Sequence, residues 1–181
     1  MNLNDWAQKI HENAVAHGWW ESDRNATEIL ALIHSEWSEA LEEDRAGRPM
    51  LYADDYEGSK RIERIEDFPD GAKPEGVAVE LIDGVIRILD FLAHEEAEIA
   101  WDGVVPSETA AQIADLTVPE LVQALHVVTA ETFLCENLGY LMTAIVMVFD
   151  FLALKGIDPE TVMRIKHDFN TRRPYKHGKK Y

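Results

Sequence analysis

The amino-acid sequence predicts an all-α protein with almost no β-structure. Apolar residues recur every three to four positions along most of the 181 residues, which is the spacing of one face of an α-helix. Residues that start and stop helices separate these segments, and strand-like alternation is nearly absent. With 46% hydrophobic and 28% charged residues, the composition is typical of a folded protein, and we expect residues 1–181 to form a single domain.

The first two helices have well-marked ends. The first is expected over residues 3–17, and it stops before Gly18. The second is expected to begin after Asn25, whose side chain is a favourable N-cap. It continues to about Ala46, where Gly47 interrupts the helical pattern.

Residues 47–75 carry no helical pattern. They are polar, and glycine and proline recur among them: Gly47, Pro49, Gly58, Pro69, Gly71 and Pro74. We expect a long loop with, at most, a short helical turn. A loop of this length in a compact domain often acts as a lid over a functional site.

The later helices follow the same logic. A third helix is expected over residues 76–100, and helical sequence resumes over residues 117–155 with a break near 137–139. The last helix is expected to end before Pro174. Residues 137–154 are nearly all apolar and approach transmembrane length, but Asp150 and the lack of a basic flank favour a buried core helix or a subunit interface.

The charge is strongly negative and unevenly distributed. The net charge is -17, from 34 acidic and 17 basic residues. The tail over residues 164–181 nevertheless contains seven bases and one acid. The acidic body favours metal cations and disfavours nucleic acid, whereas the basic tail favours a small anionic ligand or contact with the body itself.

The cysteine content and the N-terminal sequence indicate the cellular compartment that we expect for the protein. Cys135 is the only cysteine, which excludes an intrachain disulfide and a cysteine-based zinc site. The sequence Met-Asn-Leu-Asn-Asp-Trp at the start has no basic residue and no apolar run, so no signal peptide is expected. We therefore expect a cytoplasmic protein.

Acidic residues form a stripe on the third predicted helix. Over residues 77–93, every residue is apolar or glycine except Glu80, Asp83, Arg87 and Asp90. Their spacing of 3, 4 and 3 places all four on one narrow face. A helix that is apolar nearly all round is buried, and a buried carboxylate costs several kcal/mol unless it is paired or binds a metal. Arg87 can neutralise one acid, and a divalent cation would neutralise the rest.

The second predicted helix carries a matching pair. Glu36 and Glu39 are three residues apart, so they lie on one side of the helix. If this helix packs against the third, four carboxylates can converge, and such oxygen ligands suit Mg²⁺ or Mn²⁺. The competing interpretation is a structural ladder of buried ion pairs that runs through Arg87.

The last predicted helix supplies positive charge. Lys166, Asn170 and Arg173 are spaced four and three residues apart, so they share one face. Lysine and arginine bind phosphate oxygens well, and no glycine-rich phosphate loop is present. The alternative is a solvated tail that offsets the acidic body or binds a partner.

These motifs together resemble the MazG-like all-α nucleoside triphosphate pyrophosphohydrolases. The matching residues are His34-Ser-Glu36-Trp-Ser-Glu39, Glu80-Leu-Ile-Asp83 and Lys166-x-x-x-Asn170-x-x-Arg173. Two features depart from the family pattern. The 40 residues between Glu39 and Glu80 exceed its usual spacing, and residues 100–140 resemble an added helical segment.

The resemblance implies a four-helix-bundle core that a second subunit completes, in a homodimer or homotetramer. It implies Mg²⁺-dependent hydrolysis of a nucleoside triphosphate to the monophosphate and pyrophosphate, in nucleotide-pool house-cleaning. The implied metal ligands are Glu36, Glu39, Glu80 and Asp83, and Glu36 or Glu39 would accept the proton of the attacking water. The implied phosphate and sugar ligands are Lys166, Asn170, Arg173 and Lys179.

The base of such a substrate needs an aromatic surface. Trp19, Trp20 and Trp37 are candidates for stacking, although each also suits the apolar core. Narrower activities on the same scaffold are a dUTP- or dCTP-selective diphosphatase and, more distantly, a phosphoribosyl-ATP pyrophosphohydrolase. A different class of function is a non-catalytic helical oligomer whose carboxylates form structural ion pairs.

Overall fold

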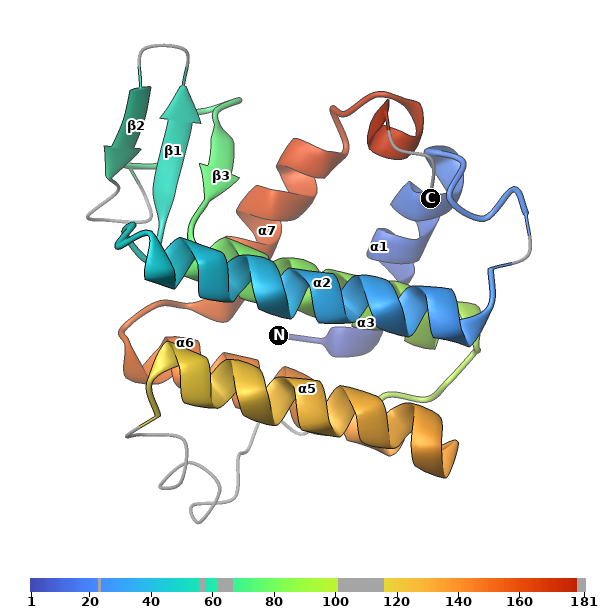
Figure 1. Ribbon diagram of the computed structural model, residues 1–181. Coiled ribbons are helices and arrows are strands. Elements are labelled where there is room, and N and C mark those ends of the chain that lie inside the picture. The colour runs from blue at the N-terminus through green and yellow to red at the C-terminus, as the bar shows by residue number, and fades with distance from the viewer. Residues whose placement is uncertain (23, 56–57, 62–66, 101–115, 179–181) are drawn as a thin grey trace.

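The computed structural model describes residues 1–22, 24–55, 58–61, 67–100 and 116–178. It is mainly helical, as predicted (Figure 1). The elements are α1 (Leu3–Ala16), α2 (Ala26–Arg45), β1 (Tyr52–Asp55), β2 (Gly58–Arg61), β3 (Lys73–Glu75), α3 (Val77–His94), α5 (Val118–Cys135), α6 (Gly139–Leu154), α7 (Pro159–Asn170) and the 3-10 helix η2 (Tyr175–Gly178).

Side-chain caps fix the helix starts that the sequence indicated. The Asn25 side chain accepts a hydrogen bond from the backbone N–H of Glu28 at 2.8 Å, which begins α2. At the start of α5, Thr117 and Glu120 form a reciprocal capping box. Asp158 caps α7 by accepting from the backbone N–H of Thr161 at 3.1 Å. These local bonds satisfy backbone donors that a helix leaves unpaired at its first turn.

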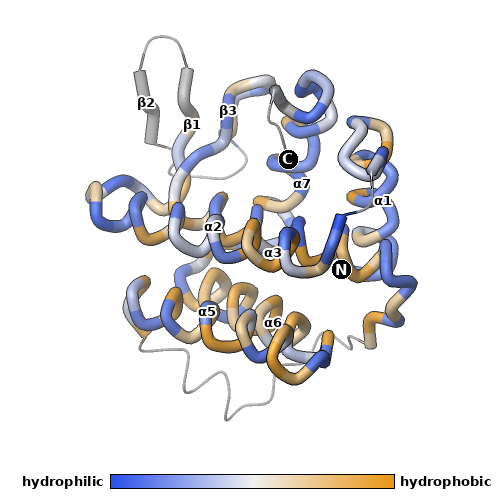
Figure 2. The backbone as a smooth tube through the Cα atoms, turned by 45° about the vertical axis from the view of Figure 1, so that its right-hand side comes forward, coloured by the Kyte–Doolittle hydropathy of each residue, from blue (hydrophilic) through white to orange (hydrophobic). Residues whose placement is uncertain are grey.

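Helix α3 is the central element of the molecule. It contacts α1, α2, α6 and α7, and its side chains are buried on nearly every side. Figure 1 shows α2 running alongside α3, with α5 and α6 as a second pair below them. Hydropathy follows this arrangement, because apolar residues concentrate in α3, α5 and α6 (Figure 2). The polar stripe on α3 therefore lies among apolar side chains, with Glu80 buried and Asp83, Arg87 and Asp90 half-buried.

The long predicted loop contains a small sheet, so that part of the prediction is wrong. Strand β1 pairs with β2 and β3 in the antiparallel order β2-β1-β3, with Tyr52 opposite Arg61 on one side and opposite Glu75 on the other. The strands have three or four residues each, too few for a clear alternation of apolar and polar positions. The Tyr52 hydroxyl accepts from Arg48 at 2.8 Å and donates to Glu43 at 3.0 Å, which ties the sheet to the end of α2.

One helix end differs from the prediction, and one predicted break in a helix is confirmed. Helix α3 ends at His94 rather than near residue 100, and Glu96 then takes a left-handed backbone conformation. The break predicted near 137–139 is confirmed, because α5 ends with Glu136 in the left-handed region and α6 starts at Gly139. The predicted added segment over 100–140 thus contains α5, whereas residues 101–115 lie outside the described residues.

Among the described residues, no helix is on its own both long and apolar enough to cross a membrane. Helices α6 and α7 meet the criterion only when taken together, and a bend of 109° separates them. Much of the apolar surface of α6 is buried in the core instead: Leu141, Ala144, Ile145, Val148, Phe149, Phe151 and Leu152.

Candidate metal centre

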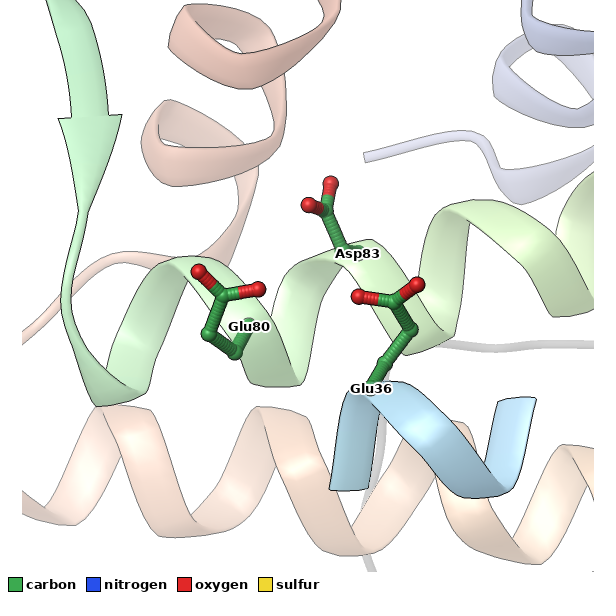
Figure 3. A group of neighbouring side chains, drawn as sticks. All are labelled: Glu36, Glu80 and Asp83. Carbon is green, nitrogen blue, oxygen red and sulfur yellow. The ribbon is translucent and has the colours of Figure 1, made fainter. Parts of the chain in front are cut away.

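Three carboxylates from two helices meet at the junction of α2 and α3. Glu36 of α2 and Glu80 and Asp83 of α3 each place one oxygen so that all three oxygens lie within 4.8 Å of one another. Figure 3 shows the three side chains converging on one space beside the two helices. Glu36 is 4% exposed and Glu80 is 7% exposed, so water cannot fully solvate them. We call these three residues the carboxylate cluster.

A glycine allows the two helices to approach closely enough to form this cluster. The Trp37 ring of α2 packs directly on Gly84 of α3, where an added Cβ would overlap the ring. Trp37 is fully buried, and its Nε1 donates to the Thr129 hydroxyl of α5 at 3.0 Å. Since Trp37 is one residue after Glu36 and Gly84 is one residue after Asp83, this contact positions the carboxylates. This enclosure fits the apolar-core role that the sequence also allowed for Trp37.

Two cations neutralise part of the cluster. Arg87 Nε donates to Glu36 Oε1 at 2.6 Å, and Lys166 Nζ of α7 donates to Asp83 Oδ2 at 2.6 Å. Sequence spacing suggested that Arg87 pairs with an acid on its own helix, but the neighbouring helix provides its partner. Within the described chain, no side chain pairs with the Glu80 carboxylate. The cluster therefore keeps one buried acid without a direct counter-charge.

Burial and crowding of like charges shift the pKa values of the cluster acids. Burial, together with repulsion from Asp83 and Glu39, raises the pKa of Glu36 to about 7, although Arg87 opposes the change. Burial and repulsion from Asp83 raise the pKa of Glu80 to about 8, against the attraction of Lys166. Burial alone would lower the pKa of Lys166, but Asp83 and Glu80 outweigh it and raise that pKa. Three ionised acids would exceed the two cations in charge, and the raised pKa values show that the cluster favours an added proton or cation.

This donor set fits a hard divalent cation. Mg²⁺ prefers carboxylate oxygens, binds through a few of them and completes its shell with water or phosphate. The unpaired Glu80 and the short oxygen separations are compatible with such a cation. Glu39 lies on the exposed side of α2 and outside the three-oxygen group, so the predicted set of four ligands is reduced to three that converge. Glu39 still lies close enough to act electrostatically on Glu36 and Glu80.

A pocket opens beside the cluster, between α1, α3 and α7. It contains the predicted residues Asn170 and Arg173, together with Asp83 and Arg87. Burial lowers the pKa of Arg173, and attraction to Asp83 partly opposes that change. The Asn170 Oδ1 atom is buried and has no hydrogen-bond partner among the described residues. A buried acceptor in that state is satisfied by a donor from a ligand or water. We call this cavity the α1–α7 pocket.

The C-terminal segment holds one wall of the α1–α7 pocket in place. The backbone N–H of Lys176 donates to the His17 carbonyl at 2.9 Å, and His17 Nε2 lies 3.1 Å from the Arg173 carbonyl. Tyr175 packs on Gly18, whose φ of 80° and lack of a side chain permit the contact. Figure 1 shows this turn beside the end of α1. Arg173 is thereby fixed opposite the residues that follow α1.

The other predicted substrate residues have different positions. Lys166 is buried within the cluster rather than open to solvent, and Lys179 lies outside the described residues. Trp20 stacks on His94 at 3.7 Å between ring centroids, and its Nε1 donates to Asp90 at 2.9 Å. Trp20 therefore supports Asp90, a residue that lines the α1–α7 pocket, whereas its neighbour Trp19 lines the pocket itself.

Arg24 is a pocket residue that sequence reasoning missed. It stands just before the cap of α2, 59 residues from Asp83, and no spacing rule connects the two positions. In the structure it lines the α1–α7 pocket together with Asp83 and Trp19. An arginine shortly after two tryptophans was the only sequence signal for a role of Arg24.

Comparison of the chain with known protein families, with curated proteins and with solved structures gave no match.

Proposed function

We propose that the protein is a Mg²⁺-dependent nucleoside triphosphate pyrophosphohydrolase that releases a nucleoside monophosphate and pyrophosphate. The observation that carries the proposal is the carboxylate cluster, in which Glu80 is buried without a counter-charge beside a cation-lined pocket. An acidic cluster of this kind suits a divalent cation, and the adjoining cations suit a phosphate chain. The resemblance to the MazG-like enzymes supports the same conclusion.

The protein's own residues have distinct roles in this reaction. Arg87 and Arg173 bind phosphate oxygens from the α1–α7 pocket and stabilise the charge that develops on them. Asn170 Oδ1 accepts a hydrogen bond from a ribose hydroxyl. Lys166 orients the Asp83 carboxylate through their 2.6 Å contact. Together these contacts hold the triphosphate against the carboxylate cluster.

Hydrolysis adds water to the α-phosphorus and breaks the bond to the bridging oxygen of the β-phosphate. Glu36, Glu80 and Asp83 would hold Mg²⁺, which neutralises phosphate oxygens and lowers the pKa of bound water when present. Glu39 accepts the proton of the attacking water, because it adjoins the cluster and is not among the three converging ligands. The hydroxyl oxygen stays on the monophosphate, and the electron pair leaves with pyrophosphate.

We also propose that two or four copies assemble in the cytoplasm, and that a second copy completes a four-helix core. Helices α5 and α6 leave large apolar side chains exposed: Val127 at 49%, Phe133 at 58%, Leu134 at 71% and Leu154 at 51%. Exposed apolar groups on neighbouring helices are typical of subunit interfaces. Removal of unwanted nucleotides from the cellular pool is the proposed biological role.

A second candidate function is a non-catalytic helical oligomer. The pairs Arg87–Glu36 and Lys166–Asp83, each 2.6 Å long, favour it because both have the geometry of structural ion pairs. This alternative leaves Glu80 unexplained and requires no metal ion. Metal dependence therefore separates the two functions.

The test is pyrophosphate release from a panel of nucleoside triphosphates with and without Mg²⁺. We expect turnover only with the metal, and Glu80→Gln should lower it by at least about 100-fold while helix content persists. Asp150→Asn is the matched control. It also replaces a buried carboxylate by an amide, but on α6, outside the cluster and the pocket. Absence of turnover on every substrate, combined with no Mg²⁺ binding by calorimetry, would refute the proposed function.

A further inference from the structure

The α1–α7 pocket has two chemically different ends. Near the carboxylate cluster it presents Arg87 and Arg173, whereas its other end presents Trp19, Arg24 and Asp90. Asp90 follows Asp83 by seven residues on α3, so the two ends are about 10 Å apart along the helix axis. The far end therefore lies beyond the position of the phosphates in the proposed reaction.

Arg24 at the far end has a buried donor with no partner. Its side chain is only 8% exposed, and its Nε donates to Glu28 Oε1 at 2.8 Å. Its Nη2 atom is buried and finds no acceptor within the described residues. An unsatisfied buried guanidinium donor is costly, so an acceptor from a bound molecule would stabilise this arrangement.

The charges around Arg24 argue against a phosphate at this end. Glu28 forms an ion pair with Arg24, and Asp90 lies close enough for their charges to interact. The two carboxylates offset the positive charge of Arg24, so the far end offers a hydrogen-bond donor without net positive charge. A neutral acceptor suits it better than a dianionic phosphate.

The shape of the far end favours a flat ring. Trp19 lines the pocket there, and the Arg24 guanidinium lies 5.6 Å from the centre of its indole ring. The same guanidinium lies 5.5 Å from the Trp20 ring, whose Nε1 is fixed by Asp90. A planar, neutral heterocycle can stack on such an aromatic surface and place an edge atom near Arg24.

We propose that Arg24 is the residue that selects the base, an inference that rests on the proposed function and deepens it. Arg24 Nη2 donates to a ring carbonyl oxygen of a base that lies against Trp19. The site therefore prefers a base with a carbonyl group over adenine. Adenine has an amino group where hypoxanthine has its carbonyl, and that amine would set two donors against each other.

The test uses a matched pair of substrates, inosine triphosphate and adenosine triphosphate, with kcat/KM as the measurement. We expect the wild-type protein to prefer the inosine substrate by about 10- to 100-fold. Arg24→Met, which keeps a long apolar side chain, should bring the ratio near one by slowing the inosine reaction. Arg45→Met, the same change at an exposed arginine of α2 outside the pocket, should retain the preference. An equal loss on both substrates, or a wild-type preference for adenosine, would overturn the inference.

A binding measurement separates this inference from the proposed function. Tryptophan fluorescence is titrated with inosine and adenosine monophosphates, which cannot undergo the reaction. Selective inosine binding that Arg24→Met abolishes would support base selection even if no triphosphate were hydrolysed. Equal binding of both nucleotides by an active wild-type enzyme would reject base selection alone. If Arg24→Met lacks native helix content, Arg24→Gln replaces it. The Gln Nε2 atom corresponds to Arg24 Nε and can still donate to Glu28, whereas no atom occupies the Nη2 position, so we expect the same loss of selectivity.

Discussion

Helix α3 carries largely buried acids at two places. The chain supplies hydrogen-bond partners for the acid at one place and leaves one acid without a partner at the other. Near its start, Glu80 and Asp83 meet Glu36, and the available cations leave Glu80 without a direct partner. Two turns later, Asp90 lies 2.7 Å from His11 Nδ1 and accepts from Trp20 Nε1 at 2.9 Å. The chain itself satisfies Asp90, whereas the cluster is satisfied only when something is added.

The difference separates an acid that the chain itself satisfies from the candidate metal ligands on the same helix. Burial raises the pKa of Asp90, but the hydrogen bonds from His11 and Trp20 oppose the change. In the cluster, repulsion from neighbouring acids adds to burial, and the pKa of Glu80 rises to about 8. Burial is common to both places, and unbalanced like charge belongs to only one.

The largest expected effect comes from breaking the satisfied acid. Asp90→Ala leaves His11 Nδ1 and Trp20 Nε1 without their acceptor, and we expect a loss of about 3 kcal/mol in the free energy of unfolding. Urea unfolding of the metal-free protein measures it. Asp90→Asn keeps one acceptor oxygen and should lose clearly less. Stability of Asp90→Ala within about 0.5 kcal/mol of wild type would show that these bonds contribute nothing.

The opposite sign is expected for the unbalanced acid. The pKa of Glu80 rises from 4.5 to about 8 on folding. Below pH 4.5 this acid is protonated in both the folded and the unfolded state and does not lower the free energy of unfolding. As the pH rises toward 8, the unfolded state loses its proton first, so the folded protein loses stability. Glu80→Gln removes that loss. We expect the metal-free variant to be more stable than wild type by about 2 kcal/mol at pH 8, with the difference shrinking toward pH 5. Urea unfolding at both pH values measures it, with Glu95→Gln, an exposed acid just beyond the end of α3, as the control. A difference that does not change with pH would contradict this account.

The smallest expected effect is the stabilisation by Mg²⁺, which should depend on the carboxylate cluster and not on Asp90. At pH 8, about 10 mM Mg²⁺ should stabilise the wild-type protein by about 1 kcal/mol through binding to the folded state. The increment should persist in Asp90→Ala and vanish in Glu80→Gln, and thermal unfolding with and without EDTA measures it. Equal stabilisation of both variants would place the binding of Mg²⁺ outside the cluster.

Local sequence signals predicted the helices well because capping and periodicity act over short distances. Asn25 and Asp158 marked two helix starts that the structure confirms. Strands β1 to β3 were missed, since strands of three or four residues depend on pairing between segments rather than on a pattern within one. The end of α3 was placed too late, because acidic residues such as Glu95 suit a helix by propensity but lie beyond its end here.

The candidate site was predictable where residues share one helix and not where helices cross. The spacing of Glu80 and Asp83 was enough to place both acids on one face of α3. The pairing of Arg87 with Glu36 and of Lys166 with Asp83 depends on how α2 and α7 pack on that face. Only the packed structure could reveal it.

The close packing of Trp37 on Gly84 makes a residue without a side chain part of the candidate site. A methyl group at position 84 would collide with the Trp37 ring and push α2 away from α3. Glu36 would then move out of reach of Glu80 and Asp83, although every functional atom would remain in the sequence. Under the proposed function, a mutational screen for lost activity should therefore group position 84 with the carboxylates. The separation of two helix axes is as much a part of this site as its ligands.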